Sequence, residues 1–268
     1  MKRITIAGGD ERLISVRSRL LKEGHIVATL GLFENDGGDI SASDIVILPV
    51  PTTKDGINVY APLTNRNISL SFVEDSLSAG QTVLCCGRDF SGVRCIDYGT
   101  IDSYAIANAV PTVEGAIKLA IENTPFTLFS SNVLVIGFGR VGKVLADRLK
   151  AMGCLVTVSS RRNYDAALIK ALGMNSISTG ELHGSSLDYD MIFNTVDAEV
   201  LSENDLERTA ARLIMDLSSK GGFDLQKAKL AGITALKPPG LPGKTAPETA
   251  GEILADTLVG IIKTLEKE

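Results

Sequence analysis

Tryptophan is absent from this 268-residue sequence, histidine occurs twice, and aromatic residues make up 5% of the chain. Histidine is the commonest general base and metal ligand in proteins. His25 opens an apolar stretch near the N-terminus, and His183 lies in an irregular stretch over residues 179–186. The sequence therefore favours neither a multi-histidine metal site nor a histidine-based catalyst.

Cysteine is scarce as well. Cys85, Cys86, Cys95 and Cys154 form no CxxC pair and have no histidine at metal-ligand spacing, so neither a zinc site nor a disulfide framework is supported. Cys85 and Cys86 end the apolar run of residues 82–86, which favours small buried side chains over the alternative of a redox role. Without disulfides, we expect residence in the cytoplasm.

An excess of basic charge and long apolar runs are also missing. The 27 basic residues are outnumbered by 32 acidic ones, and the net charge of −5 argues against nucleic-acid binding. No run approaches the 18 or more apolar residues of a membrane span, and MKRITIAGG is typical of a buried strand, not of a signal peptide. With 44% hydrophobic and 22% charged residues, we expect a soluble globular protein of two modest domains or one large one.

The most informative segment is residues 131–162. An apolar run over 132–136 precedes a glycine motif and an amphipathic stretch, and a second apolar run covers 155–158. The motif reads Gly137-Phe138-Gly139-Arg140-Val141-Gly142. Its first glycine permits a tight turn, its second lets the backbone approach a pyrophosphate, and its third lets helix and strand pack closely. Because a helix N-terminus attracts phosphates, this order predicts a dinucleotide-binding strand–turn–helix–strand unit.

The end of the second apolar run bears on the choice of cofactor. An NAD site normally carries an acidic residue about 20 residues further on, which binds the ribose 2′-hydroxyl. Here position 160, at 160 − 142 = 18 residues past the third glycine, is Ser160. Ser159, Ser160, Arg161 and Arg162 instead offer hydroxyls and guanidinium groups that suit a 2′-phosphate. We therefore expect NADP rather than NAD; the alternative is a pair of solvated arginines.

Short apolar runs alternate with amphipathic stretches over nearly the whole chain. In the first hundred residues we expect strands at 3–7, 25–30, 44–50, 82–86 and 94–98, and a helix at 11–23. In the second half we expect strands at 132–136, 155–158, 191–194, 212–217 and 233–237, and helices at 164–172, 202–209 and 224–231. Such alternation predicts the α/β class, with two doubly wound, Rossmann-like domains built on parallel sheets.

Two further amphipathic stretches divide the chain. Apolar residues recur near helical spacing within residues 104–123. Because proline is best tolerated in a helix's first turn, Pro111 predicts a start near 109 or 110, with Asn108 as the cap. We expect an N-terminal substrate domain, residues 1–108, completed by a C-terminal helix over 246–268. Residues 109–245 would form the NAD(P)-binding Rossmann domain, and the two interdomain helices would frame a cleft.

In open α/β sheets, ligands bind beyond the carboxyl ends of the strands. In the second half, the residues that follow predicted strands are Asn194, Thr195, Val196, Ser218, Ser219, Pro239, Gly240 and Leu241. We expect the first three to line the ribose and nicotinamide and the loop over residues 241–244 to close over the ring. Asn194 and Thr195 have an alternative role in satisfying the loop backbone.

The corresponding turns of the first half carry cationic and hydroxyl side chains. Together with the start of the interdomain helix they supply Arg12, Thr52, Thr53, Lys54, Arg88 and Thr112. Guanidinium groups and hydroxyls suit carboxylates, so the set indicates a small anionic substrate. Each cation by itself is equally explained as a solvated surface charge.

Acid and base candidates are few. Glu114, on the interdomain helix, is placed to reach the expected cleft, and we take it with Asn108 as the candidate catalytic residues. A glutamate in the first turn of a helix is equally explained by the helix dipole.

Six segments share their sequence with a known family. They are Gly8-Gly9-Asp10 followed by Arg12, NAVPTVEG at 108–115, VIGFGRVG at 135–142, Phe193-Asn194-Thr195, Asp216-Leu217-Ser218-Ser219, and PGLPGKTAPETA at 239–250. In these segments the chain resembles the A subunit of dipicolinate synthase, a spore-associated enzyme of endospore-forming bacteria. Many dehydrogenases share the glycine motif, whereas the segments at 108–115 and 239–250 are much more specific to this family. Asp10 is counted with the substrate residues on this basis.

The resemblance implies an NADP-linked oxidation of a dihydrodipicolinate to dipicolinate for spore formation, with a flavoprotein partner, the B subunit. The substrate would be a small dicarboxylate, which agrees with the cationic turns. Forming an aromatic pyridine supplies much of the driving force, so positioning a ring carbon against the nicotinamide matters more than a strong base. A homodimer is expected only by analogy with two-domain dehydrogenases.

Two other functions stay open at this point. One is a different two-domain dehydrogenase, similar to the shikimate, hydroxyacid or alanine dehydrogenases, with a catalytic Lys–Asp or His pair for which Lys54 and Asp89 are candidates. The other is a non-catalytic subunit that binds NADPH without turnover and regulates a partner.

Overall fold

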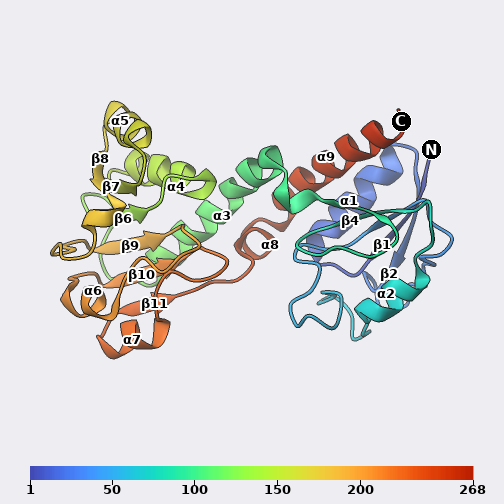
Figure 1. Ribbon diagram of the computed structural model, residues 1–268, viewed down its shortest axis with the longest axis horizontal. Coiled ribbons are helices and arrows are strands. Elements are labelled where there is room, and N and C mark those ends of the chain that lie inside the picture. The colour runs from blue at the N-terminus through green and yellow to red at the C-terminus, as the bar shows by residue number, and fades with distance from the viewer. Residues whose placement is uncertain (268) are drawn as a thin grey trace. The chain divides into compact units, whose positions relative to one another are not determined.

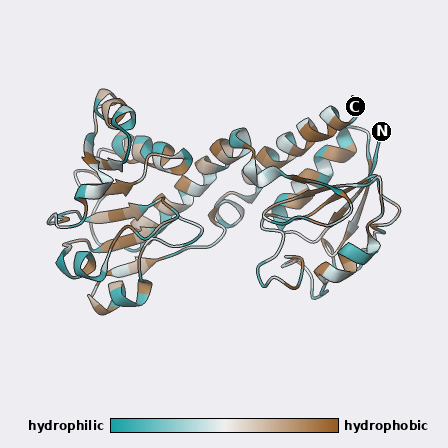
Figure 2. Cartoon of the chain, in the orientation of Figure 1, coloured by the Kyte–Doolittle hydropathy of each residue, from teal (hydrophilic) through white to brown (hydrophobic). Residues whose placement is uncertain are grey.

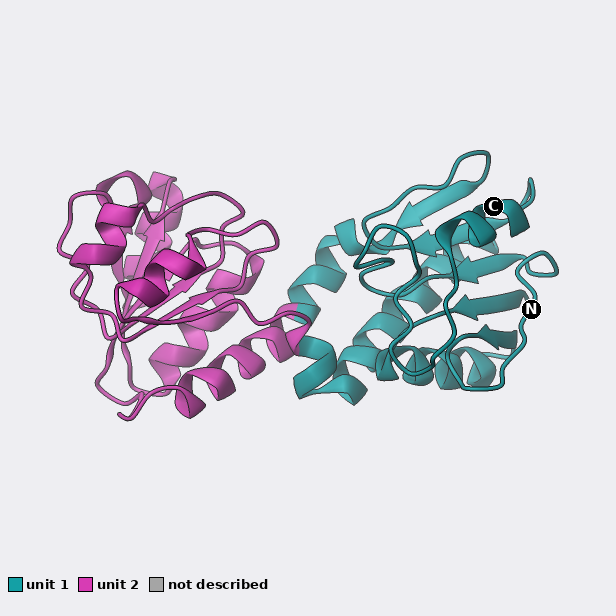
Figure 3. Cartoon of the chain, turned by 90° about the horizontal axis from the view of Figure 1, so that it is seen from below, with its two compact units in different colours: residues 1–108, 242–268 teal, residues 109–241 magenta. Residues whose placement is uncertain are grey.

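The computed structural model describes residues 1–267, and the chain divides into two compact units (Figure 3). Unit 1 comprises Met1–Asn108 and Pro242–Glu268, and unit 2 comprises Ala109–Leu241. Each unit is built on one parallel sheet with helices packed along it, so the fold class is α/β with two Rossmann-like units (Figure 1). No helix within residues 1–267 combines the length and the hydropathy needed to cross a membrane.

Unit 1 contains a five-stranded sheet in the order β2-β1-β3-β4-β5. The strands are β1 (Arg3–Ala7), β2 (Ile26–Leu30), β3 (Ile45–Ile47), β4 (Thr82–Cys85) and β5 (Arg94–Asp97). The helices are α1 (Glu11–Lys22), α2 (Leu70–Ser76), the 3-10 helix η1 (Tyr98–Thr100), the start of α3 (Asp102–Glu122), α8 (Leu241–Thr245) from Pro242 onward, and α9 (Pro247–Leu265). The chain runs outward from β1 to β2 and then returns to β3 on the other side of β1. This switch in strand order is where doubly wound sheets bind ligands.

Strands β1, β3 and β4 of unit 1 are mainly apolar because both faces of the sheet are covered. One buried cluster joins Ile4 and Ile6 of β1 to side chains of α1 and α9. A second cluster, on the other face, joins Ala7 and Val46 to Val73 of α2. In Figure 2 the hydrophobic residues gather along the strands and the inward sides of the helices.

The C-terminal helix α9 completes unit 1 by packing on α1. The two helices approach closely at Gly251, where a Cβ atom would lie 2.7 Å from Cβ of Ser15. Ion pairs flank this contact, with Nζ of Lys263 2.8 Å from a Glu23 carboxylate oxygen. This packing explains why α9 is amphipathic, because one of its faces is buried in the same cluster as α1.

Unit 2 contains a six-stranded sheet in the order β11-β10-β9-β6-β7-β8. Counted from β6, this is the 3-2-1-4-5-6 order of dinucleotide-binding sheets. The strands are β6 (Asn132–Ile136), β7 (Leu155–Ser160), β8 (Asn175–Ser178), β9 (Met191–Asn194), β10 (Leu213–Asp216) and β11 (Thr234–Leu236). The helices are the remainder of α3, α4 (Arg140–Ala151), α5 (Asn163–Ala171), the 3-10 helix η2 (Thr179–Glu181), α6 (Glu203–Arg208) and α7 (Leu225–Leu230).

The start of the interdomain helix differs from its prediction. Helix α3 begins at Asp102 and contains Pro111 in its interior, so Asn108 lies within the helix and is not its cap. An interior proline costs roughly 3 kcal/mol, but the turns before it carry Tyr104, which is 4% exposed in the core of unit 1. Burial of this side chain and of Val113 outweighs the local penalty. The predicted start was wrong because the preference of proline for the first turn is a local rule, whereas the burial of Tyr104 depends on the tertiary structure.

Several short elements were missed, among them the five-residue helix α8, which lies where a loop was expected over residues 241–244, strand β8 and helix α2. Strand β8 has the polar sequence NSIS at the edge of its sheet, and helix α2 has only seven residues. Neither presents enough apolar residues for a periodic pattern to emerge from sequence.

Candidate functional site

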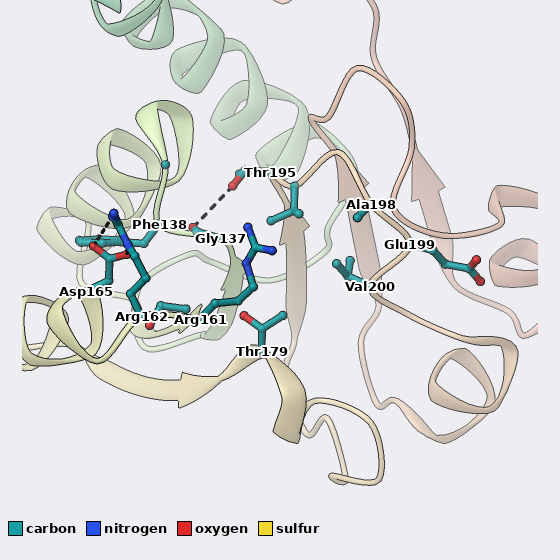
Figure 4. A pocket seen from close by; sticks show the side chains of 13 residues that line it. Gly137, Phe138, Arg161, Arg162, Asp165, Thr179, Thr195, Ala198, Glu199 and Val200 are labelled. Carbon is teal, nitrogen blue, oxygen red and sulfur yellow. Dashed lines mark hydrogen bonds and ion pairs between the residues drawn. The ribbon is translucent and has the colours of Figure 1, made fainter.

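The turn between β6 and α4 forms one wall of a pocket of about 580 Å³ in unit 2 (Figure 4). Eight of the residues singled out from the sequence line it, together with five others. The pocket is lined by Gly137, Phe138, Gly139, Ser160, Arg161, Arg162, Thr195 and Val196, and by Asp165, Thr179, Ala198, Glu199 and Val200. It lies at the carboxyl ends of β6, β7 and β9, as expected for a doubly wound sheet.

The three glycines of the turn meet different surroundings. Gly137 has a φ of 97°, and a Cβ atom there would lie 2.6 Å from Cγ2 of Val196. A Cβ atom on Gly142 would collide with the Gly137 carbonyl oxygen. Gly139 has an ordinary φ of −84° and open space within 4 Å of its missing Cβ. The first and third glycines are therefore needed by the fold, and the second leaves room beside the backbone.

Helix α4 begins beside this open space. Gly139 is its N-cap residue, and within residues 1–267 no side chain caps this end of the helix. An α-helix exposes unpaired N–H groups and a partial positive charge at its N-terminus. This end of α4 can therefore bind an anion that enters the pocket.

Two serines end β7, the strand that pairs with β6, and Ser160 lines the pocket. Ser159 is fully buried and accepts a hydrogen bond from Thr179 Oγ1 at 3.3 Å. Ser160 Oγ is buried without a hydrogen-bond partner among the described residues. Because buried hydroxyls are normally hydrogen-bonded, Ser160 presents an unused donor and acceptor at the pocket wall.

The two arginines after β7 have different partners. Arg162 forms a forked ion pair with Asp165, with distances of 2.7 Å from Nε and 3.0 Å from Nη2. The hydrogen bonds to Asp165 raise the pKa of Arg162, and the same contact lowers the pKa of Asp165. Arg161 forms no ion pair within residues 1–267, and its side chain extends along the pocket (Figure 4). Arg161 is thus the more available cation.

At the ends of β9 and β10 the structure shows a buried polar network instead of an open wall. Asn194 is fully buried and donates to Asp216 Oδ1 at 2.9 Å, while its own oxygen accepts from Val196 N–H at 3.0 Å. Asp216, 1% exposed, also accepts from Ser218 Oγ at 2.6 Å, and Nζ of Lys237 lies 3.8 Å from its other oxygen. The contacts of Asn194 with the backbone of Val196 therefore agree with its alternative role, which is to satisfy the loop backbone.

The remaining residues of the expected cofactor set lie outside the pocket lining. Arg140 and Val141 are in the first turn of α4, and Ser219 N–H donates to Asp197 at 2.6 Å. Pro239 and Gly240 precede α8, and Leu241 is buried in the core of unit 2. Their roles toward a cofactor stay predictions.

The expected substrate residues of unit 1 have partners of their own. Arg12 is 5% exposed, and its Nε donates to Asp10 at 2.9 Å while Nη2 donates to Asp10 and to the Val50 carbonyl. Thr52 is fully buried, and its hydroxyl accepts from Cys86 N–H at 2.9 Å. These contacts fasten the turns after β1, β3 and β4 to one another.

The other expected substrate and catalytic residues are spread along the chain. Thr53 bonds to Asp55 at 3.1 Å, and Arg88 pairs with Glu74 at 2.9 Å. Lys54 lies over the Tyr60 ring. Asn108, Thr112 and Glu114 all lie on α3, with Glu114 exposed. Nothing in the structure tests their roles, which stay predictions.

Sequence analysis did not single out Asp165 and Glu199, two carboxylates of the pocket. Asp165 follows Arg162 by three residues, a helical spacing that would have indicated the ion pair. Glu199 lies in a loop whose sequence has no recognisable motif or periodicity. Within residues 1–267, no group of three or more His, Cys, Asp or Glu side chains could hold a metal ion.

The strand order and the glycine turn place the chain in the class of two-unit α/β proteins with a Rossmann-type dinucleotide-binding turn. Residues 3–89 match the family model described as the N-terminal domain of the dipicolinate synthase A subunit. The chain is 33% identical to the dipicolinate synthase A subunit of Bacillus subtilis (strain 168) over 99% of this chain and 97% of that one. It belongs to the family of dipicolinate synthase A subunits.

Solved structures agree with this assignment. The A subunit of dipicolinate synthase from Bacillus halodurans superposes with a TM-score of 0.89 and 31% identity, covering 97% of both chains. A transhydrogenase from Sinorhizobium meliloti superposes with a TM-score of 0.73 and 12% identity, covering 98% of this chain and 94% of that one. The second likeness concerns the fold alone.

Proposed function

We propose that this chain is an NADP-linked oxidoreductase that oxidises a dihydrodipicolinate to dipicolinate, in the role of the A subunit of a dipicolinate synthase. Family membership over 99% of the chain supports the reaction. The Rossmann order of unit 2 and its glycine turn support a dinucleotide cofactor.

The observation that carries the proposal is the composition of the pocket at the end of β7. Position 160, where an NAD site places its acid, is a serine whose buried hydroxyl has no partner among the described residues. Arg161 and Arg162 line the same pocket. Guanidinium groups and a free hydroxyl bind a phosphate better than a ribose hydroxyl, so the residues fit the 2′-phosphate of NADP.

The rest of the pocket fits the remainder of a dinucleotide. The open space at Gly139 lets the backbone approach a pyrophosphate, and the uncapped start of α4 supplies positive potential there. Val196, Ala198 and Val200 offer an apolar surface. When bound, NADP would accept the hydride, while a proton leaves the dihydropyridine ring as it becomes aromatic.

We further propose the cellular setting that the family implies. The chain would act in the cytoplasm during spore formation, beside a flavoprotein B subunit. Its substrate would be a small dicarboxylate. A homodimer is the oligomeric state expected by analogy with two-domain dehydrogenases.

The reaction is tested by incubating the purified chain with a dihydrodipicolinate precursor and NADP, with and without the flavoprotein partner. We expect ultraviolet absorbance of the pyridine dicarboxylate to rise faster than in the protein-free control. A rate equal to the spontaneous one in both conditions would reject the proposed reaction. NADP binding without turnover would favour a regulatory role.

A further inference from the structure

A second pocket, of about 400 Å³, lies in unit 1 in the loop between β3 and α2. Its lining includes Lys54, Asp55, Tyr60 and Arg66. Neither the glycine turn nor the residues of the cofactor pocket belong to it. Its volume lies within the range of small-molecule sites, which begins at about 300 Å³.

The pocket lies at the position where a doubly wound sheet binds ligands. Unit 1 has the order β2-β1-β3-β4-β5, which switches direction between β1 and β3. Lys54 follows β3, and the pocket residue Tyr60 accepts a hydrogen bond from Gly9 N–H, in the turn after β1, at 2.8 Å. The loop therefore covers the carboxyl ends of the two strands that flank the switch point.

The loop is held in place by its own backbone. Val59 N–H donates to Ile68 at 2.9 Å, Tyr60 N–H donates to Thr52 at 2.9 Å, and Leu70 N–H donates to Ile57 at 2.8 Å. Gly8 allows close contact, since a Cβ atom there would lie 2.5 Å from Cγ1 of Val59. The pocket wall is thus built by the fold and not by a loose surface segment.

Two cations in this wall have no carboxylate partner within residues 1–267. Nζ of Lys54 lies 3.5 Å from the centre of the Tyr60 ring, a cation–π contact that orients the ammonium group. Nη1 of Arg66 donates to the Asp36 carbonyl oxygen at 2.8 Å. That contact is with a neutral acceptor and leaves the other guanidinium donors available for a bound anion.

The carboxylate in the lining forms no ion pair with these cations within residues 1–267, because hydrogen bonds from its own loop occupy its oxygens. Asp55 accepts hydrogen bonds from Asn58 N–H at 2.7 Å, Asn58 Nδ2 at 2.9 Å, Ile57 N–H at 2.8 Å and Thr53 Oγ1 at 3.1 Å. The hydrogen bonds from Asn58 and Ile57 hold the pKa of Asp55 well below its ordinary value. Asp55 therefore stabilises the turn through these hydrogen bonds.

We propose that this pocket, formed by Lys54, Tyr60 and Arg66 at the β1–β3 switch point, is the site in unit 1 that binds a small dicarboxylate. Two cations in the lining of one pocket match two carboxylates, and a guanidinium donates to a carboxylate through two parallel bonds. The inference rests on the proposed function for the identity of the substrate. Arg66 and Tyr60 are new to the site, whereas Arg12 and Thr52 support the turns beneath it.

The site is tested by calorimetric titration of the full chain with pyridine-2,6-dicarboxylate, with pyridine-2-carboxylate and with inorganic phosphate, each with and without NADPH. The variants are Lys54→Met, Arg66→Met and the double substitution, with Lys54→Arg and Arg66→Lys as conservative changes. Arg17→Met is the matched control, because Arg17 also lies over an aromatic ring, that of Phe33, but outside the pocket. Thermal unfolding verifies that each variant is folded.

We expect the dicarboxylate to bind more tightly than the monocarboxylate and phosphate. Each methionine variant should weaken it by about 10-fold or more, as for a lost charge-assisted hydrogen bond, while Arg17→Met leaves it unchanged and the conservative variants retain most of it. Equal binding by wild type and the double variant, preference for phosphate, or no binding by wild type would overturn the site. NADPH affinity, measured on the same samples, reports on the cofactor proposal separately.

Discussion

At the scale of single residues, the glycines of the turn in unit 2 have different roles: some are required by the fold, and one leaves space for a ligand. Gly142 has no room for a Cβ atom, whereas Gly139 has open space and an ordinary φ. A Cβ atom on Gly139 would project into space that a pyrophosphate needs. The same chemical change should therefore have opposite consequences at two positions three residues apart.

We predict that Gly139→Ala keeps the free energy of unfolding within about 0.5 kcal/mol of wild type and weakens NADPH binding. Gly142→Ala should lower the free energy of unfolding by about 2 kcal/mol or more, because helix α4 must shift away from the Gly137 carbonyl. Denaturant unfolding and cofactor titration measure the two effects. Full cofactor affinity in folded Gly139→Ala would contradict the role given to the turn.

Two thiols, that of buried Cys85 and that of half-buried Cys86, give a prediction about pH. Burial raises the pKa of Cys85 to about 12 and that of Cys86 to about 11, whereas an unfolded thiol has a pKa of about 8.5. At pH 8 the folded Cys86 is then on the order of 0.1% thiolate. We expect iodoacetamide to modify Cys85 and Cys86 slowly in the folded chain and quickly in guanidinium chloride, as followed by mass spectrometry.

The sign of this effect follows from the direction of the shift. Because the folded pKa values lie above the unfolded ones, the unfolded state releases these protons first as pH rises. Unfolding should therefore become easier above about pH 8.5. Rapid alkylation of Cys86 in the folded chain at pH 8 would show that the pKa of its thiol is not raised in this way.

At the scale of elements, α9 belongs energetically to unit 1. Leu254 and Leu258 are fully buried in the same cluster as Ile4 and Leu13. We predict that Leu258→Ala lowers the free energy of unfolding by about 2–5 kcal/mol, the usual cost of such a cavity. Glu252→Ala, exposed on the same helix, is the control, and a similar effect of both changes in denaturant unfolding would argue against the packing.

Strands and helices differ in how far the sequence predicts them. Strands β1, β6 and β9 are mainly apolar because most of their residues are buried, and the sequence predicts them directly. Strand β8 is polar and pairs only with β7, so it has no such signal. The start of α3 was predicted wrongly because Pro111 marks a boundary locally, while the burial of Tyr104 is visible only in three dimensions.

At the scale of the whole molecule, the α/β class follows from the alternation of elements, but the strand orders do not. The candidate site is likewise predicted from the sequence only in part. Spacing in the sequence places Gly137, Ser160 and Thr195 at strand ends, and the sheet order brings them around one pocket. The closed network around Asp216 depends on side-chain contacts that no motif encodes.

The central claim is that the pocket after β7 holds the 2′-phosphate of NADP. The most direct test is titration of NADPH and NADH into the wild-type chain and into the Arg161→Ala/Arg162→Ala double variant, with Arg148→Ala, exposed on α4, as control. We predict that wild type prefers NADPH and that the double variant loses about 10- to 100-fold in NADPH affinity while NADH binding is unchanged. Equal affinity of wild type for both cofactors, or an equal loss of both in the double variant, would contradict the account.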